Sequence, residues 1–162
     1  MDLVYIFSSF ILIMSLLVLS IIDALSFRLP DWLTLPLIIL GMVSTYLMNM
    51  SIIMSFLGAA IGYGVLVGIE IGYKHIRGRD GLGRGDAKLF AAGGAWCGAM
   101  ALPVILLFAS VSALLFVVTL KIGLRKAVSL DSAIAFGPFL SFGIGLVYCM
   151  RGLELIPILS MF

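Results

Sequence analysis

In a chain of 162 residues that is 63% hydrophobic and only 11% charged, with a mean hydropathy of +1.27, too few charges are present to cover a water-exposed surface. A soluble domain carries about 25% charged residues, so a soluble enzyme or binding protein is excluded and lipid must solvate most of the surface. The length leaves room for one domain, residues 1–162, and the net charge of +2 is uninformative as a sum.

Six apolar segments follow one another along the chain, and they predict an all-α, polytopic membrane protein with six transmembrane helices. A helix needs about 20 apolar residues to cross the hydrocarbon core, and the fourth segment, rich in Ala and Gly, is the shortest. Asp31 is placed to cap the second segment, and Pro103 is acceptable in the first turn of the fifth. The segments run approximately over residues 3–22, 32–48, 52–73, 87–100, 101–122 and 132–150.

Lysine and arginine residues predict the orientation of these helices. If the loops alternate between two sides, nine of the ten basic residues fall on one side and only Arg151 falls on the other. Basic loops stay in the cytoplasm, so we expect the charged loops to be cytoplasmic and both termini to lie outside. The first segment begins Met1-Asp2 without a basic region, so we expect a retained helix rather than a cleaved signal peptide.

Small residues at four-residue spacings predict where helices touch, because they let backbones approach closely in lipid. Gly137 and Pro138 near the start of the sixth segment also predict a kink there. The small residues concerned are Gly58, Gly62, Gly64, Gly68 and Gly72 in the third segment, Gly94 and Gly98 in the fourth, and Gly137, Ser141 and Gly145 in the sixth.

The cysteines and the histidine do not form a recognisable metal or redox motif. Cys97 and Cys149 sit in apolar runs without a neighbouring His, and the one histidine, His75, lies in a charged loop. We therefore expect no metal site and no cofactor. A bridge between the two cysteines is conceivable if both lie near the outer ends of helices, but buried free cysteines are the commoner case.

Three acids close to helix ends are the candidates for chemistry, since ionisable groups are costly in lipid. Asp23 ends the first segment, Glu70 lies one turn inside the end of the third, and Asp86 opens the fourth. Alternating glycines at 81, 83 and 85 precede Asp86, and we expect them to permit unusual backbone angles and the pairing of an extended peptide beside this loop. A dinucleotide fingerprint needs a glycine in place of Asp86 and a βαβ unit, so nucleotide binding is excluded.

Two carboxyls that meet at a membrane–water boundary suit acid–base hydrolysis. Like charges in close contact cannot both ionise, so the pair shares a proton, and one member activates water while the other donates to the substrate. The residues alone leave a structural role open, with Asp86 favouring the helix dipole and Asp23 a boundary residue. Glu70 is placed to pair with Lys74 one turn later. Lys88 is suited equally to orienting the substrate and to anchoring a helix.

Three sequence blocks resemble those of the type IV prepilin peptidase family. Gly83-Arg84-Gly85-Asp86 resembles its GxGD signature, the segment 23–36 resembles its first aspartate segment, and the segment 135–140 resembles its last-helix motif. The blocks are spread over nearly the whole chain. The resemblance implies that Asp23 and Asp86 are the catalytic pair, and Gly83, Gly85, Lys88 and Glu70 are candidates for supporting residues.

The resemblance also implies an activity and a location. We expect a membrane-embedded aspartic endopeptidase that cleaves the basic leader of prepilin-like precursors (pilin, pseudopilin, Flp-type or archaellin) at the cytoplasmic face of the inner membrane. Prepilins and lipid are then the expected partners, nucleic acid is not, and the oligomeric state stays open. The chain starts directly at its first helix without the N-terminal cysteine pairs of longer members, so it resembles the short, peptidase-only forms and we do not expect methyltransferase activity.

Two alternatives remain beside this interpretation. Presenilin-like GxGD proteases pair the signature with Tyr-Asp and Pro-Ala-Leu, whereas Asp23 follows Ile22 and no Pro-Ala-Leu occurs here. The other alternative is a non-enzymatic membrane subunit of a pilus or secretion assembly, in which the acids serve ion passage or docking. A proton path needs acids near the middle of the bilayer, whereas these acids cluster at one face, which favours hydrolysis.

Overall fold

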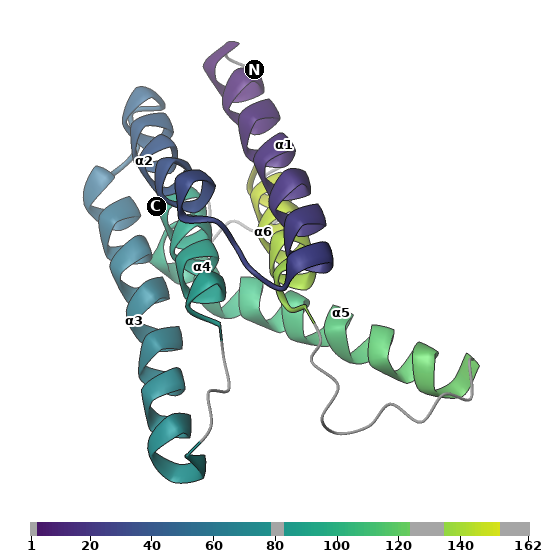
Figure 1. The fold of residues 1–162 in the computed structure, drawn as a ribbon. Coiled ribbons are helices and arrows are strands. Elements are labelled where there is room, and N and C mark those ends of the chain that lie inside the picture. The colour runs from purple at the N-terminus through teal and green to yellow at the C-terminus, as the bar shows by residue number, and fades with distance from the viewer. Residues whose placement is uncertain (1–2, 79–82, 124–134, 153–162) are drawn as a thin grey trace.

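The computed structural model describes residues 3–78, 83–123 and 135–152, and this part of the chain is an all-α bundle (Figure 1). The prediction of an all-α protein with six helices is confirmed. The elements are α1 (Leu3–Ser26), α2 (Asp31–Leu47), α3 (Ile52–Arg77), α4 (Arg84–Cys97), a 3-10 turn η1 (Ala99–Ala101), α5 (Leu102–Gly123) and α6 (Gly137–Gly152).

Three of these helices are long and apolar enough to cross a membrane: Leu3–Ser26, Ile52–Ile76 and Ala99–Ile122. Their lipid-facing character is visible in large apolar side chains that stay exposed, such as Phe7 and Leu114. The helix α2 has 17 residues, α6 has 16 and α4 has 14. At 1.5 Å per residue α4 is about 21 Å long, shorter than the roughly 30 Å hydrocarbon core. The prediction of six spans is therefore confirmed for three helices only.

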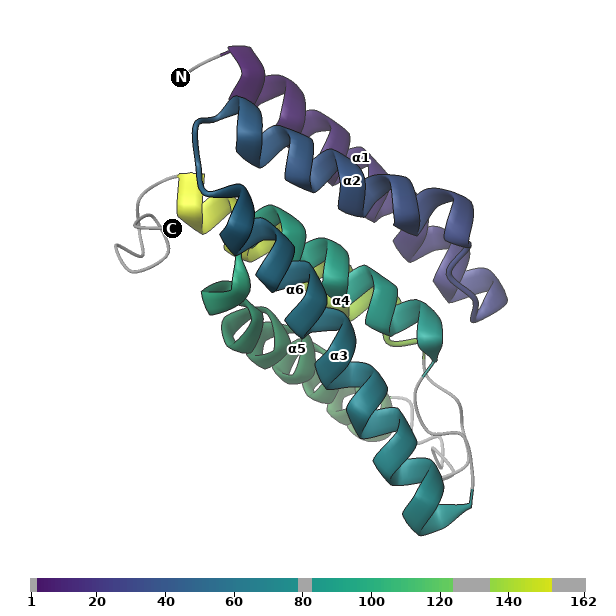
Figure 2. The ribbon, with the colours of Figure 1, turned by 90° about the vertical axis from the view of Figure 1, so that its left-hand side faces the viewer.

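The short helix α4 forms the centre of the bundle and packs against α2, α3 and α6 (Figures 1 and 2). Every residue from Leu89 to Cys97 is buried. Its small side chains let the neighbours come close, and hydrogen bonds fix it: Ser55 Oγ of α3 donates to Ala95 O at 2.6 Å, and Trp96 Nε1 donates to Leu37 O of α2 at 2.9 Å. The composition of α4 thus suits a helix enclosed by protein rather than by lipid.

Only two of the five glycines on α3 pack against a neighbouring helix. Gly58 and Gly62 face α4, and at Gly58 a β-carbon would collide with the backbone of Gly94. At Gly64, Gly68 and Gly72 none of the described residues lies within 4 Å of the place a β-carbon would occupy, so the predicted contacts are wrong for these three within the described part. The face of α3 toward α4 continues through the buried Leu66 and Glu70, and Glu70 pairs with Arg84 of α4, so these three glycines lie on another face of the helix.

The contacts predicted at Gly98 and along α6 have different outcomes. A β-carbon on Gly98 would meet none of the described residues within 4 Å, and its φ of +84° makes it the C-terminal cap of α4. On α6 the predicted contacts are confirmed: Gly137 lies against Asp23, Ser141 is buried, and Gly145 faces Leu16.

The structure differs from the sequence-based expectations for the start of α6, for a kink in that helix and for a bridge between the two cysteines. The helix α6 begins at Gly137, not at residue 132; residues 132–134 lie outside the described part, and 135–136 are not helical. Pro138 therefore occupies the first turn, where its missing N–H breaks no bond, and the predicted kink is wrong. Cys97 is buried, Cys149 is exposed and both are free, so the conceivable bridge does not form.

Candidate active site

Asp23 is buried at the seam between α1 and α6. It continues a stripe of buried residues on α1, Leu12, Leu16 and Leu19, so the period of the helix carries its side chain inward. Only 5% of Asp23 is exposed. The backbone N–H of Gly137 donates a hydrogen bond to Asp23 Oδ2 at 2.9 Å, and a β-carbon on residue 137 would lie 2.5 Å from the same oxygen. The absence of a side chain at Gly137 thus makes this bond possible.

Sequence reasoning missed this role of Gly137. The glycine was interpreted as a packing residue, although it belongs to the 135–140 block that resembles the last-helix motif of the family. That block was the one available signal, because a contact across 114 positions leaves no local pattern.

Asp86 lies in the first turn of α4, directly after the GxG segment. Gly83 is the N-terminal cap residue with an ordinary φ of −74°, and its carbonyl accepts a hydrogen bond from Asp86 N–H at 3.0 Å. The helix already begins at Arg84. The expected unusual angles and strand-like loop are therefore wrong for residues 83–86, and position 81 lies outside the described part. This turn presents Asp86 as a helix N-terminal residue.

The two glycines of the signature differ in their surroundings. A β-carbon on Gly85 would come within 2.8 Å of Leu29 Cβ, and Leu29 is buried beneath α4. A β-carbon on Gly83 would meet only Asp86 Oδ2, at 3.6 Å, which is ordinary contact. Gly85 thus allows the first turn of α4 to rest on the α1–α2 connection.

We expect Gly85→Ala to lower activity at least ten-fold and Gly83→Ala to lower it much less. The added methyl at residue 85 must push α4 away from Leu29 and carry Asp86 with it, whereas the methyl at residue 83 fits. Initial cleavage rates of both purified variants, corrected for folded protein by thermal unfolding, test this difference. Equal losses would contradict the assigned role of Gly85.

Asp86 and Asp23 interact electrostatically, although they come from different helices. Burial, and then the negative charge of Asp23, raise the pKa of Asp86 from 3.8 to about 6. Burial acts because a charged carboxylate loses water, and Asp23 acts because like charges repel. Asp86 lies at the start of α4, outside the three spanning segments, and with this pKa it can bind and release a proton near neutral pH.

The raised pKa of Asp86 predicts a pH-dependent loss of stability that Asp86→Asn removes. The folded protein binds this proton more tightly than the unfolded chain, so wild type loses stability as pH rises from about 4 through 6. One pKa unit corresponds to about 1.4 kcal/mol, and partial exposure of Asp86 reduces the effect to about 1–2 kcal/mol. Melting temperatures in detergent at pH 4.5 and 7.5 test this. A wild-type change no larger than that of Asp86→Asn would contradict it.

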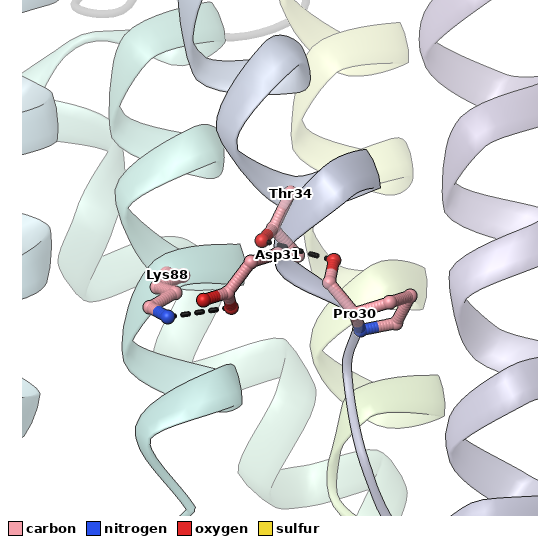
Figure 3. A network of polar contacts seen from close by, with 4 residues as sticks. All are labelled: Pro30, Asp31, Thr34 and Lys88. Carbon is pink, nitrogen blue, oxygen red and sulfur yellow. Dashed lines mark hydrogen bonds and ion pairs between the residues drawn. The ribbon is translucent and has the colours of Figure 1, made fainter.

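Lys88 ties α4 to α2 through an ion pair. Its Nζ donates to Asp31 Oδ1 at 2.5 Å, from the second turn of α4 to the first residue of α2 (Figure 3). Asp31 was predicted to cap α2, but the cap residue is Pro30 and no side chain caps the helix. That prediction is wrong because Asp31 is itself helical and its carboxylate faces Lys88. Contact between Lys88 and substrate stays a prediction.

Glu70 ties the first turn of α4 to α3. Its Oε1 lies 3.5 Å from Arg84 Nε, and Glu70 is buried whereas the Arg84 side chain is largely exposed. The predicted pairing of Glu70 with Lys74 stays a prediction. Together with Lys88–Asp31, this pair clamps the start of α4 between α2 and α3, so Glu70 and Lys88 both hold Asp86 in place from outside.

Within residues 3–78, 83–123 and 135–152, no group of three or more His, Cys, Asp or Glu side chains is arranged to hold a metal ion. The independence from a cofactor stays a prediction.

A helical bundle with several apolar helices long enough to span a membrane belongs to the class of polytopic membrane proteins, and here two interacting carboxyls lie at one end of the bundle. The type IV leader peptidase family matches residues 10–118, a stretch that includes both Asp23 and Asp86. The chain therefore belongs to the type IV leader peptidase family.

Relatives support the same assignment. The prepilin leader peptidase/N-methyltransferase of Escherichia coli strain K12 is 41% identical over 128 residues, which cover 78% of this chain and 56% of the relative. The protein of that name from Pectobacterium carotovorum is 39% identical over 151 residues, 90% of this chain and 52% of the relative. That from Pseudomonas aeruginosa is 41% identical over 128 residues, 78% and 43%. The chain thus spans about half the length of the curated relatives it matches. No solved structure gives a significant match.

Proposed function

We propose that this protein is a membrane-embedded aspartic endopeptidase that cleaves the leader peptide of prepilin-like precursors at the cytoplasmic face of the inner membrane. The observation that carries the proposal is the electrostatic interaction between Asp23 of α1 and Asp86 of α4. The end of α1 and the start of α4 lie at the end of the bundle away from the N-terminus (Figure 1). Family membership and the printed names of the relatives support the substrate class.

The two carboxyls divide the work of hydrolysis in this proposal. Asp23, held by the N–H of Gly137, takes a proton from a water molecule, and the resulting hydroxide attacks the scissile carbonyl carbon. Asp86, with its raised pKa, gives its proton to the carbonyl oxygen. When the C–N bond breaks, the proton that Asp23 took from water passes to the leaving amine. The products are one new carboxyl and one new amine. No covalent enzyme intermediate is needed.

The cytoplasmic orientation follows from the basic residues at this end of the bundle. Arg28, Lys74, Arg84 and Lys88 all lie at or near the helix ends around the carboxyls, as the positive-inside rule requires of a cytoplasmic face. The relatives' names include an N-methyltransferase activity, and our expectation that this chain lacks it stays a prediction.

We expect Asp23→Asn and Asp86→Asn each to lower cleavage at least a thousand-fold, because an amide can neither take nor give the required proton. The asparagine at 23 keeps an oxygen for Gly137 N–H, so the fold should persist. Co-expression with prepilin precursors from the same genome, followed by the size shift of the product, measures the loss.

Asp31→Asn is the control for the loss of an acid at the same end of the bundle; it removes the ion-pair partner of Lys88, so we expect it to keep most of the activity that Asp23→Asn and Asp86→Asn lose. Normal processing by either Asp23→Asn or Asp86→Asn would overturn the proposed pair. Failure of wild type to cut any precursor would shift weight to a non-enzymatic membrane subunit.

A further inference from the structure

The turn that follows α1 runs directly from one candidate carboxyl to the support of the other. Asp23 lies in the last turn of α1, and Leu29, in the link to α2, is buried against Gly85 of α4. A β-carbon on Gly85 would lie 2.8 Å from Leu29 Cβ and 3.4 Å from Leu29 N, so the backbone of the link closely approaches the residue before Asp86. A change in the path of this turn therefore moves the start of α4 relative to α1.

Phe27 changes the direction of the chain in this turn, and its backbone conformation is strained. Its φ is +53°, in the left-handed region that glycine enters freely and a bulky residue rarely adopts. Such a conformation persists only where the surrounding structure holds it. The ring of Phe27 is exposed, so packing of the ring against the described helices does not provide that hold. Hydrogen bonds of the turn must provide it.

The hydroxyl of Ser26 bonds to the chain on both sides of Phe27. Ser26 Oγ lies 2.7 Å from Ile22 O and 3.2 Å from Arg28 O, and its single proton is shared between these two carbonyls. In addition, Phe27 N–H donates to Asp23 O at 2.8 Å. These bonds join the helical part of the chain, which carries Asp23, to the non-helical link that leads to α4.

We propose that Ser26 is a positioning residue whose hydroxyl, by fixing this turn, sets the distance between the carboxyls of Asp23 and Asp86. The inference rests on the proposed function and adds to it the group that holds the two acids at a working separation. Ser26 acts through Leu29 and the first turn of α4, and it needs no contact with the substrate.

The separation of the two acids has a readout that does not depend on cleavage. Burial, and then the charge of Asp23, raise the pKa of Asp86 to about 6, so a looser turn weakens the repulsion and lowers that pKa. The other two acids that the structure describes, Asp31 and Glu70, pair with Lys88 and Arg84, and Arg28 on the turn itself is exposed. The fall in stability between about pH 4.5 and 7.5 therefore reports the closeness of Asp23 to Asp86.

Ser26→Ala tests the inference through melting temperatures in detergent at these two pH values. We expect the fall in melting temperature to shrink by roughly a quarter to a half, because the charge of Asp23 is the second cause of the raised pKa after burial. Ser26→Thr keeps the hydroxyl and should restore the wild-type fall. Ser9→Ala is the matched control: Ser9, near the opposite end of α1, donates to Tyr5 O at 2.7 Å and lies 3.4 Å from Tyr148 Oη.

Cleavage rates complete the test. Single-turnover cleavage of a prepilin precursor should fall about ten-fold in Ser26→Ala and stay at the wild-type rate in Ser9→Ala. If Ser26→Ala lowers the melting temperature equally at both pH values, the hydroxyl has a structural role only and the inference is overturned. The same shrinkage in Ser9→Ala would overturn it as well. If wild type cuts no precursor while the fall still shrinks in Ser26→Ala alone, the proposed chemistry fails and the positioning of the two acids stands.

Discussion

Gly94→Ala is expected to separate α3 from α4 and to destabilise the protein by about 1–3 kcal/mol, the usual cost of forcing a methyl into a packed contact. The reason is the close approach of two backbones, since a β-carbon on Gly94 would collide with the carbonyl of Gly58. A backbone carbonyl cannot rotate away as a flexible side chain can, so the whole helix must move. Thermal unfolding in detergent measures the loss.

Gly64→Ala provides the control for this prediction on the same pair of helices. Nothing lies within 4 Å of a β-carbon at Gly64, so the higher helix propensity of alanine should leave stability equal or slightly raised. Opposite signs for the two variants would confirm that the contact, and not the glycine content, holds α4. Equal losses would show that the backbone contact does not carry the stability.

The movement of α4 links this packing to the candidate site. Asp86 lies in the first turn of the helix, and the pairs Arg84–Glu70 in that turn and Lys88–Asp31 in the next turn hold the start of α4 from the sides. Both pairs are partly exposed and so contribute little alone, about 0–1 kcal/mol each. The buried part of α4, from Leu89 to Cys97, therefore does most of the positioning.

The helices could be predicted from the sequence because lipid imposes a simple rule on them. Long apolar runs must be helical when no water can satisfy the backbone, and α1, α2, α3 and α5 begin and end within a few residues of the predicted limits. The enclosed helix α4 obeys a different rule, since protein rather than lipid surrounds it. Hydropathy alone could not reveal that a short Ala- and Gly-rich segment is a buried helix at the centre of the bundle.

The two carboxyls of the site could be predicted from the sequence, but the residues that contact and position them could not. Motif resemblance singled out Asp23 and Asp86 as the candidate carboxyls, and the structure brings the two within electrostatic reach. The partners Gly137, Asp31 and Glu70 come from other helices, and their contacts depend on how the helices pack. For the same reason, a regular glycine spacing on α3 could not tell that Gly64 lies on a face of the helix turned away from α4.

Gly137→Ala is expected to lower cleavage at least a hundred-fold while most of the fold remains. Its methyl would fall 2.5 Å from Asp23 Oδ2, so either the carboxyl rotates away from the Gly137 N–H or α6 withdraws from α1. Both movements displace a candidate catalytic group by roughly 1 Å, which costs about a hundred-fold in rate when geometry governs the reaction. Single-turnover cleavage measures this loss apart from binding.

A double-mutant cycle shows whether the loss acts through Asp23. Asp23→Ala removes the carboxyl with which the new methyl collides, so Gly137→Ala should destabilise the Asp23→Ala protein much less than it destabilises wild type. Additive losses of stability would mean that residue 137 acts on α6 alone. A coupling between the two positions would instead tie the glycine, the carboxyl and the rate together, and it would explain why the last helix carries a residue without a side chain opposite the first aspartate.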